Sequence, residues 1–410
     1  MQSWIKSIHV NKLRQLQDFD IAICDDQAMR HLLVTGPNGS GKTTLLKSML
    51  ANLERIVADG NLSHLNFEKY LAQSQDVLQH ATGEVDAVQR KANAKIWENQ
   101  IRLWWSELRL SLVGETHIAE QFANRKFIVS FYADERKSTF VQVKNPEKPE
   151  IKHSVKEKNG EQFLKFLVDL KVQQALAKNE GKDRDAQEIQ EWFDGFRDVL
   201  RQIFGDKTLE IEFEYRDYSF KIRAGGRAFP FTGLSAGYAA VLDIVSDLIL
   251  KMQDANRLVR VYDMPGIVLI DEVETHLHLA LQKQIMPILT QVFPRVQFIV
   301  STHSPFVLNS IRNATVYDLS RHEALNDLTD YSYEALAEGF FGVETDSGEL
   351  KRRLDRMEEL IGKGALSVSE KDELDEFLED FEKIPNGVAP AQKLRFNDLK
   401  RQYLLKDRAQ

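Results

Sequence analysis

Apolar residues occur in short, regularly spaced groups along the first part of the chain. Residues 5–10 and 19–23 carry them at alternating or clustered positions, and residues 32–34 are all apolar. Between residues 45 and 57, leucines and other apolar side chains recur at helical spacing. This pattern predicts three strands followed by an α-helix.

The middle of the chain changes from helical to strand-like periodicity. Residues 65–105 form a long polar stretch with helical character, and its three tryptophans are expected to pack it against its neighbours. Alternating apolar residues at 108–112, 127–131 and 140–143 predict half-buried antiparallel strands. Residues 144–158 are rich in Lys, Glu and Pro and predict an exposed loop. The lysines of this loop could contact a nucleic acid backbone, but a solvated loop is the simpler interpretation.

Helical spacing returns at residues 163–170 and 189–203, and the alternation within 209–222 predicts a hairpin. A further helix is predicted after Tyr238, with apolar side chains at positions 241–249. No internal repeat and no sustained heptad pattern occurs in this middle region.

The first candidate site is the segment Gly36-Pro37-Asn38-Gly39-Ser40-Gly41-Lys42-Thr43, followed by Thr44. It lies between a predicted strand and a predicted helix, which is the context in which G-x-x-x-x-G-K-[ST] forms a P-loop. Backbone N–H groups and the helix N-terminus would hold a polyphosphate. Lys42 would reach the β- and γ-phosphates, and Thr43 would offer its hydroxyl to Mg²⁺. The alternative is an ordinary glycine loop, which the flanking pattern disfavours.

A continuous apolar run begins at Gly266 and ends in Asp271 and Glu272. Such a run is typical of a buried parallel strand, which would deliver the two carboxylates at its carboxyl end. Asp271 would hold Mg²⁺, directly or through water, and Glu272 would orient or deprotonate the attacking water. The alternative is an acidic strand end that caps the next helix.

A second apolar run, at residues 298–301, ends close to His303. One helix separates it from Glu272, so the two strand ends can be neighbours across a βαβ crossover, with His303 near the γ-phosphate. Between them, residues 274–278 are predicted to start that helix. His276 and His278 suggest a metal site, but we prefer hydrogen bonding at a subunit contact because no convincing third ligand is present.

The segment Thr232-Gly233-Leu234-Ser235-Ala236-Gly237-Tyr238 leads into the helix predicted after Tyr238. Its glycines and Ser235 could offer amides and a hydroxyl to an anion at a helix N-terminus. Taken alone this signal is weak, because Ser and Gly also cap helices for structural reasons.

Composition narrows the class of protein but names no partner. The 410 residues can hold one large domain with insertions or two ordinary ones. No long apolar run and no signal-peptide pattern is present, so we expect a cytoplasmic protein that does not enter a membrane. The single cysteine, Cys24, excludes an internal disulfide framework. A net charge of -8 argues against bulk attraction to nucleic acid, although a local basic patch is compatible with it.

Taken together and in this order, GPNGSGKT, LSAGY, IVLIDEVETHLH and STHSP resemble the ABC-type ATPases. They are most similar to the soluble branch that contains RecF, Rad50, the SMC proteins, the OLD proteins and ATPases of anti-phage systems. The resemblance implies a P-loop α/β head with an antiparallel β lobe, ATP and Mg²⁺ as ligands, and a head-to-tail homodimer or larger assembly. In such a dimer Ser235 and Gly237 would act on ATP bound by the partner's P-loop. Glu272 would be the catalytic glutamate and His303 the switch histidine, while the family's Q-loop glutamine cannot be placed.

The same resemblance gives the expected domains: an ATPase head at 1–320, with an insertion at about 60–225, and a helical region at 321–410. The long interval from Lys42 to Ser235 argues against a transporter ATPase, and the absence of extended heptads argues against an SMC protein. Too few residues follow His303 for the Toprim nuclease of OLD proteins.

Amphipathic helices are predicted in the C-terminal region, at about 350–360 and 369–381. Asp372, Glu373, Asp375 and Glu376 could suggest a nuclease, but their neighbours follow helix periodicity, and we expect a docking region instead. A short helical tail of this kind resembles the ATPase subunits of Septu and some retron defence systems. We therefore expect an ATPase that controls a separate effector, such as an HNH nuclease, in anti-phage defence, with possible DNA or RNA contact. The alternative is a RecF-like repair ATPase that binds DNA across the dimer.

Overall fold

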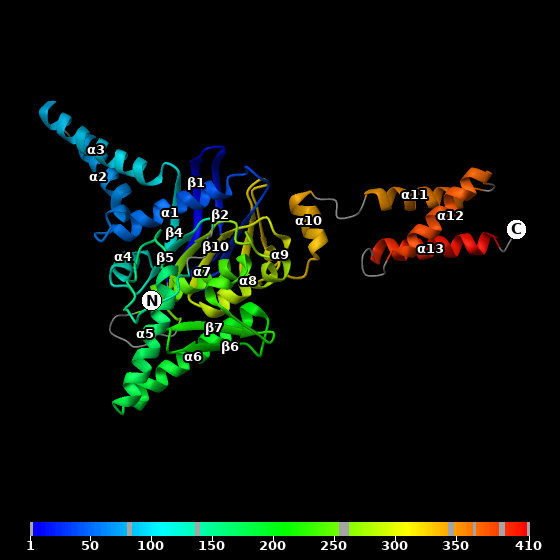
Figure 1. The fold of residues 1–410 in the computed structure, drawn as a ribbon. Helices are drawn as coiled ribbons and strands as arrows, with labels where there is room; N and C mark the ends of the chain where they lie inside the picture. The colour runs from blue at the N-terminus through cyan, green and yellow to red at the C-terminus, as the bar shows by residue number, and fades with distance from the viewer. Residues whose placement is uncertain are drawn as a thin grey trace. The chain divides into compact units, whose positions relative to one another are not determined.

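The computed structural model describes residues 3–79, 84–135, 140–253, 262–342, 348–363, 366–384 and 390–407. The chain forms two compact units, an N-terminal unit at Met1–Tyr333 and a C-terminal unit at Glu334–Gln410. Figure 1 shows the α/β organisation of the N-terminal unit and the helices of the C-terminal unit. Among the described residues, no helix is long and apolar enough to cross a membrane.

A six-stranded sheet forms the centre of the N-terminal unit, in the order β12-β11-β3-β10-β9-β5. Its strands are β3 (His31–Thr35), β5 (Ile128–Tyr132), β9 (Gly266–Ile270), β10 (Val296–Ser301), β11 (Ala314–Asp318) and β12 (Glu323–Asn326). All neighbours pair in parallel except β11 and β12. The two apolar runs predicted to be buried parallel strands are therefore confirmed as β9 and β10.

Two strand predictions were wrong. The segment at 127–131 was expected in an antiparallel pair, but β5 pairs in parallel with β9 at the edge of the central sheet. The segment at 140–143 forms no strand, and Phe140 instead contacts the rings of Phe163 and Phe231. In both places the short alternating run indicates that apolar side chains are buried. It does not indicate whether a strand forms or in which direction that strand pairs.

Side chains bury both faces of the central sheet. On one face, Leu32 and Val34 of β3 and Leu269 of β9 join a core with Leu46 and Met49 of α1 (Lys42–Ala58). On the other face, the intervening residues of β9 and β10 are also fully buried. The helices α7 (Ala236–Lys251), α8 (Leu279–Val292) and α9 (Pro305–Leu308) belong to this unit. Burial on both faces explains why the parallel strands are continuous apolar runs.

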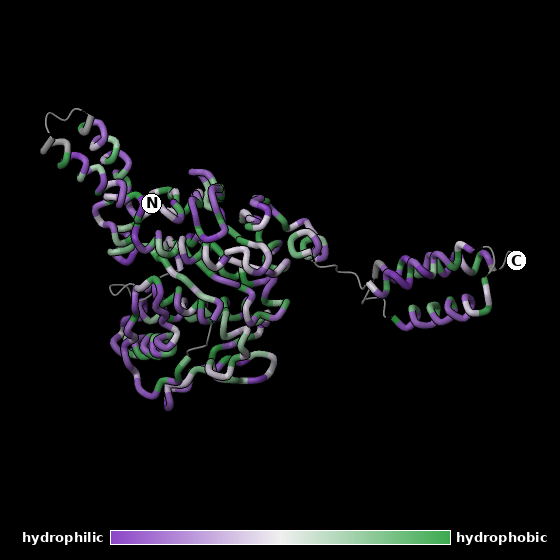
Figure 2. The backbone as a smooth tube through the Cα atoms, turned by 90° about the horizontal axis from the view of Figure 1, so that it is seen from above, coloured by the Kyte–Doolittle hydropathy of each residue, from purple (hydrophilic) through white to green (hydrophobic). Residues whose placement is uncertain are grey.

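A second, antiparallel sheet packs against α1. It has the order β2-β1-β4 and contains β1 (Trp4–Leu13), β2 (Leu16–Ala22) and β4 (Leu108–Val113), as predicted from the alternation. The polar stretch before β4 forms α2 (Phe67–Gln79) and α3 (Glu84–Trp105), after the short 3-10 helix η1 (Ser63–Asn66). The helices α2 and α3 lie side by side and extend away from the rest of the unit (Figures 1 and 2). We call this helical pair the arm.

The remaining elements of the N-terminal unit lie between β4 and α7 in sequence. They are α4 (Glu115–Ala123), α5 (Gly160–Asn179), α6 (Asp183–Phe204), the antiparallel strands β6 (Glu210–Glu214), β7 (Ser219–Ala224) and β8 (Arg227–Pro230), and the 3-10 helix η2 (Phe231–Gly233). The predicted helices and the predicted hairpin are confirmed here. Trp192 and Phe196 of α6 stack on each other and contact the rings of Phe166 and Phe163 of α5.

The C-terminal unit is helical in its described residues. It contains α10 (Tyr333–Phe341), which begins at the boundary, and α11 (Gly348–Gly362), α12 (Val368–Lys383) and α13 (Pro390–Asp407). The last three share an apolar core, in which Leu354 and Met357 of α11 meet Phe377 of α12 and Phe396 of α13. The two predicted helices are confirmed as α11 and α12, and the four acidic residues considered for a nuclease lie on α12.

Candidate nucleotide site at the end of the parallel sheet

The parallel pairing brings the predicted chemistry to one edge of the central sheet. Val34 pairs with Ser301, and Val300 with Ile270, so β3, β10 and β9 end at nearly the same level. The chain continues from these ends into the P-loop, into His303 and into Asp271, respectively. Three segments that are distant in sequence therefore supply one site, as expected where parallel strands end together.

The P-loop connects β3 to α1 through three glycines with positive φ. The φ angles are 138° at Gly36, 80° at Gly39 and 104° at Gly41. Residues that carry a Cβ atom rarely adopt such values. A Cβ atom at Gly41 would also lie 3.0 Å from Leu16. From the turn after β1, Gln15 donates a hydrogen bond of 2.8 Å to the Gly39 carbonyl. The antiparallel sheet thus braces the loop from outside.

Lys42 is held inside the loop. Its side chain is buried, and Nζ donates hydrogen bonds to the carbonyl oxygens of Gly36 at 2.9 Å and Pro37 at 3.2 Å. Burial lowers the pKa of the ammonium group, while the negative charges of Glu272 and other nearby carboxylates oppose this shift. The ammonium therefore lies in a site where its charge is incompletely solvated and available to an anion.

Asp271 and Glu272 adopt a fixed arrangement at the end of β9. The Ser301 hydroxyl donates a hydrogen bond of 2.5 Å to Asp271 Oδ1 and accepts one of 2.8 Å from the Glu272 amide. The Asp271 amide donates to the Tyr132 carbonyl at 2.8 Å. Glu272 has a φ of 45°, an uncommon value for a residue with a side chain, and its carboxylate accepts a 3.4 Å hydrogen bond from Thr275. The strain at Glu272 marks a position that the surrounding contacts enforce.

His303 follows β10 and lies next to the same carboxylates. Its amide donates a 2.5 Å hydrogen bond to Glu274 Oε1. Burial and the positive charge of Lys42 lower the pKa of the imidazole, and the carboxylates of Glu274, Glu272 and Asp271 only partly oppose them. At neutral pH the ring is therefore neutral, so one ring nitrogen can donate and the other can accept a hydrogen bond.

The segment around Ser235 and Gly237 is built differently. Ser235 is the exposed N-cap residue of α7, and its side chain makes no capping hydrogen bond. Gly237 is buried, and a Cβ atom there would lie 3.0 Å from the His276 carbonyl. The start of α7 therefore packs directly on the loop after β9 while Ser235 faces outward. The next helix was expected to start at 274–278, but residues 274–276 form a turn and α8 starts only at Leu279, with His278 as its N-cap.

A buried polar network joins α7 to β5. Asp247 is fully buried and accepts hydrogen bonds from the Tyr132 hydroxyl at 2.6 Å and from Asn159 Nδ2 at 2.9 Å. Lys251 forms a 2.9 Å ion pair with Asp247 and donates to the Ser130 hydroxyl at 3.0 Å. Because the Tyr132 carbonyl also holds the Asp271 amide, this network connects α7 with the carboxylate edge.

The structure adds Asp318 to the residues that sequence patterns suggested. It ends β11, is buried, and its Oδ1 lies 3.6 Å from the position of a Cβ atom on Gly36. Oδ1 also accepts hydrogen bonds from the Ser320 amide and hydroxyl at 2.7 and 2.6 Å. Neither Asp318 nor Gln15 stands in a motif. Only the pairing of β11 with β3 and the turn after β1 bring them to the loop.

Parts of the chain are similar to known proteins. The profile of the AAA_21 family, described as "AAA domain, putative AbiEii toxin, Type IV TA system", matches residues 111–309. The chain is 21% identical to the Septu protein PtuA of Bacillus mycoides (strain KBAB4), over 93% of this chain and 51% of that protein. It is 26% identical to the "Retron Vc95 probable ATPase" of Vibrio cholerae serotype O1 biovar El Tor, over 46% of this chain and 35% of that protein.

A solved SMC head domain from Thermotoga maritima is 13% identical with a TM-score of 0.36, covering 78% of this chain and 94% of that one. The chain spans about half the length of the PtuA protein that it matches and about a third of the retron ATPase. In its sequence the chain is thus similar to the Septu PtuA proteins and to retron ATPases, and residues 111–309 match the AAA_21 family.

Proposed function

We propose that the chain binds ATP with Mg²⁺ at the end of the parallel sheet and hydrolyses it in sites shared between two copies. The observation that carries this proposal is the convergence of Lys42, Asp271, Glu272 and His303 from three neighbouring strand ends. Together they supply three kinds of chemical group: an ammonium, two carboxylates and a neutral imidazole. An ordinary glycine loop would not require the other three beside it.

The residues at the loop suit a nucleotide-bound Mg²⁺. Thr43 offers a hydroxyl and Asp271 a carboxylate, and both are hard oxygen donors of the kind that Mg²⁺ prefers. Among the described residues, no group of three or more His, Cys, Asp or Glu is arranged as a metal cage. Thr43 and Asp271 would hold the ion together with phosphate oxygens, and the bound ion would neutralise charge on the β- and γ-phosphates.

The chain's own residues then perform defined tasks. The P-loop amides and Lys42 would bind the β- and γ-phosphates, for which Nζ must leave the carbonyls of Gly36 and Pro37. Glu272 would orient the attacking water and accept its proton. The neutral ring of His303 would hydrogen-bond the γ-phosphate or the water and so position the reacting atoms.

The exposed position of Ser235 supports a composite site. Its hydroxyl and the following amides lie at the N-terminus of the long helix α7, which favours anions. In a head-to-tail pair, this surface of one copy would close over ATP held by the other. ATP would then stabilise the pair by contacting both copies.

The relatives support a role in defence. Because Septu PtuA and retron ATPases match the chain, we propose that ATP occupancy controls a separately encoded effector, with an HNH nuclease as the first candidate. These matches favour this role over RecF-like repair. If the chain works in this way, it should copurify with a nuclease encoded beside it, and the complex should change with ATP. Copurification with repair proteins alone would instead support the alternative.

A mixing experiment tests the composite site directly. Lys42→Ala should abolish ATP binding, and Ser235→Arg should retain ATP binding but block closure, so each variant alone should have hydrolysis reduced by at least about 100-fold. In a mixed dimer, one site contains both defects and the other contains neither. Mixing the two variants should therefore restore up to about half of the wild-type rate in the mixed species. Independent sites within single copies predict no restoration, and that result would refute the shared site.

A further inference from the structure

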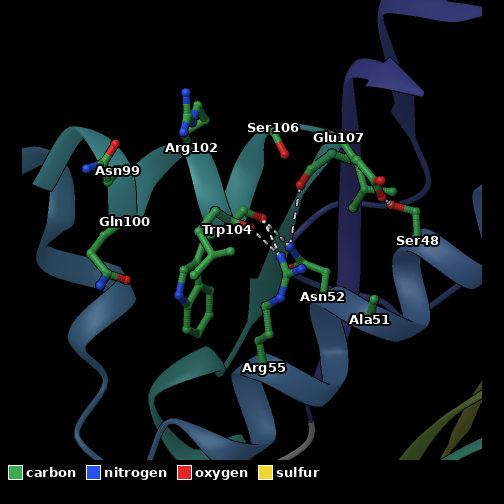
Figure 3. A pocket seen from close by; sticks show the side chains of 12 residues that line it. Ser48, Ala51, Asn52, Arg55, Asn99, Gln100, Arg102, Trp104, Ser106 and Glu107 are labelled. Atoms are coloured by element: carbon green, nitrogen blue, oxygen red, sulfur yellow. Dashed lines mark hydrogen bonds between the residues drawn. The ribbon is translucent and has the colours of Figure 1, made fainter. Parts of the chain in front are cut away.

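The last turn of the arm is fastened to the helix that follows the P-loop. A pocket of about 720 Å³ lies between α1 and the end of α3. Figure 3 shows the side chains that line it. Three residues on one side of α1 bond to its walls. The Ser48 hydroxyl donates a hydrogen bond of 2.6 Å to the Glu107 carboxylate. Asn52 donates one of 3.1 Å to the Trp104 carbonyl, and Arg55 donates one of 2.7 Å to the Leu103 carbonyl. The pocket therefore has a fixed floor that belongs to the nucleotide-binding helix.

Two arginines of this pocket have no carboxylate partner among the described residues. The Arg55 guanidinium donates to the backbone carbonyls of Leu103 and Trp104, and the exposed Arg102 side chain makes no hydrogen bond or ion pair there. The pocket also contains the amides of Asn99 and Gln100. Such a lining suits an anion that has further polar groups.

The cationic surface continues along α3. Lys91, Lys95 and Arg102 are exposed, and their spacing of four and seven residues places them on one side of the helix. Like Arg102, the two lysines form no ion pair within the described part of the chain. At a rise of 1.5 Å per residue, the first and last of these three residues are about 16 Å apart along the helix axis. Phosphates follow one another about every 3.4 Å along one strand of a duplex, so this length faces several of them.

Two carboxylates belong to the same surface and reduce its positive charge. Glu98 lies on the same side of α3, between Lys95 and Arg102, and Glu107 lines the pocket. The Ser48 hydroxyl already engages Glu107. Against these two negative charges stand Arg55, Arg102 and the two lysines, so the surface is locally positive although the whole chain carries a net charge of -8. A local excess of cations in an acidic protein is the feature expected of a surface that attracts an anionic partner.

We propose that the outer face of α3, together with the pocket at its end, binds the phosphodiester backbone of a nucleic acid. Lys91, Lys95 and Arg102 would contact phosphates along the helix, and Arg55 would offer its guanidinium to a phosphate at the pocket. Contacts of this kind give affinity with little sequence selectivity and a strong dependence on salt.

Fluorescence anisotropy with labelled single-stranded DNA, single-stranded RNA and duplex DNA tests this surface at several salt concentrations between about 50 and 200 mM. The triple variant Lys91→Gln, Lys95→Gln, Arg102→Gln should bind at least about tenfold more weakly than the wild type at about 50 mM salt. For a single strand, the slope of log affinity against log salt should become shallower by about 2, since each lost phosphate contact removes about 0.7. Exposed helix-surface substitutions of this kind should leave the fold intact.

Two comparisons separate this surface from general electrostatic attraction and from a loss of folding, respectively. The pair Lys178→Gln, Lys207→Gln removes exposed lysines elsewhere in the N-terminal unit and should leave binding unchanged. Glu98→Gln removes a negative charge from the proposed surface and should tighten binding about two- to fivefold. A loss of folding would weaken binding and cannot produce that opposite sign.

The proposal is overturned if the wild type binds none of the three nucleic acids at about 50 mM salt. It is also overturned if the control pair weakens binding as much as the triple variant, or if Glu98→Gln fails to tighten it. Binding at this surface does not depend on ATP hydrolysis. Lys42→Ala should bind the same nucleic acids without nucleotide, so failure of the nucleotide site would not be mistaken for failure of this surface.

Discussion

The carboxyl edge of the central sheet and the C-terminal unit use charge in opposite ways. At the sheet edge, Lys42 and Asp271 are almost fully buried and lie within a dense set of polar contacts. In the C-terminal unit the interior is apolar, and charged groups such as Arg356 and Glu373 pair at its surface. The first arrangement buries charge within polar contacts, while the second keeps its ion pairs at the surface of an apolar core.

This difference predicts which substitutions each region tolerates. At the sheet edge, a change of one atom can alter a charge or a proton acceptor without changing volume, so isosteric substitutions should have large effects on activity. In the C-terminal unit, the fold depends on filling a small core, so changes in volume should dominate. Four experiments, ordered by expected effect, examine this contrast.

The largest effect is expected for Glu272→Gln. The substitution preserves shape but removes the proton acceptor, so ATP hydrolysis should fall about 100- to 1,000-fold while ATP binding is retained. The ATP-bound dimer should live longer, which size-exclusion chromatography with ATP would detect. The shorter substitution Glu272→Asp should keep more activity than Glu272→Gln because it retains a carboxylate. Equal hydrolysis in wild type and Glu272→Gln would contradict the assigned role.

In the C-terminal unit, Phe381→Ala should have the largest effect on stability. Phe381 is 1% exposed and stacks on Phe396 with ring centres 5.2 Å apart. Its truncation should cost about 3–5 kcal/mol, enough to open a small helical core. Hydrogen exchange should show lost protection in α11–α13 with ATP hydrolysis unchanged. Leu404→Ala, at a site 46% exposed, should change protection little. Equal effects of both substitutions would argue against a volume-dependent core.

His31 is a titratable side chain buried in the central sheet, where a change of charge should affect stability. Burial lowers the pKa of its imidazole to about 4, and Nδ1 accepts a 3.1 Å hydrogen bond from the Phe298 amide. The unfolded chain takes up a proton near pH 6.5, whereas the folded chain does so only near pH 4. Protonation of His31 therefore does not affect the free energy of unfolding above about pH 6.5. As the pH falls from 6.5 to about 4, it lowers that free energy by about 3 kcal/mol in total.

Urea unfolding of the N-terminal unit at several pH values measures this contribution. His31→Gln should flatten the decline between pH 6.5 and 4 relative to the wild type, whatever its effect at neutral pH. His322→Gln, at an exposed histidine, should leave the decline as it is. Parallel pH profiles for the wild type and His31→Gln would show that His31 does not titrate in this way.

The smallest effect concerns the start of α12. The Ser367 hydroxyl accepts a hydrogen bond from the Glu370 amide, and the Glu370 side chain bonds back to the Ser367 amide, which forms a capping box. Ser367→Ala should cost about 1 kcal/mol of stability of this helix, and Ser367→Asp should recover most of it. Two measurements test this: thermal unfolding of the full chain, and hydrogen exchange at α12 in the folded chain. No difference between the two variants would exclude a capping contribution.

Sequence patterns predicted the sheet edge well because its chemistry lies in contiguous segments. A glycine loop, an apolar run and the residues at its end are each specified within about ten positions, and parallel pairing then brings the ends together. This is why the P-loop, Asp271 and His303 could be placed at one edge in advance. Their catalytic roles remain predictions that the variants above test.

The remaining features depend on partners that are far away in sequence. The run at 127–131 has the same alternation whether it pairs in parallel or antiparallel, and only β9 decides. Gln15 and Asp318 carry no motif: Gln15 reaches the loop from the turn after β1, and Asp318 reaches it through the pairing of β11 with β3. Likewise, nothing in the pattern around Asn52 and Arg55 indicates that they hold the end of α3, because their acceptors are backbone carbonyls. The helix α13 was not predicted from the sequence.

The single cysteine has a practical consequence for spectroscopy. Cys24 is half-buried, its thiol lies 3.5 Å from the Ile5 carbonyl, and burial raises its pKa, so at neutral pH it should react slowly with maleimides. A cysteine introduced at an exposed site would then accept a fluorophore first without removal of the native thiol. Dyes placed in this way on the arm and on α12 would allow single-molecule energy transfer to follow both units during nucleotide turnover.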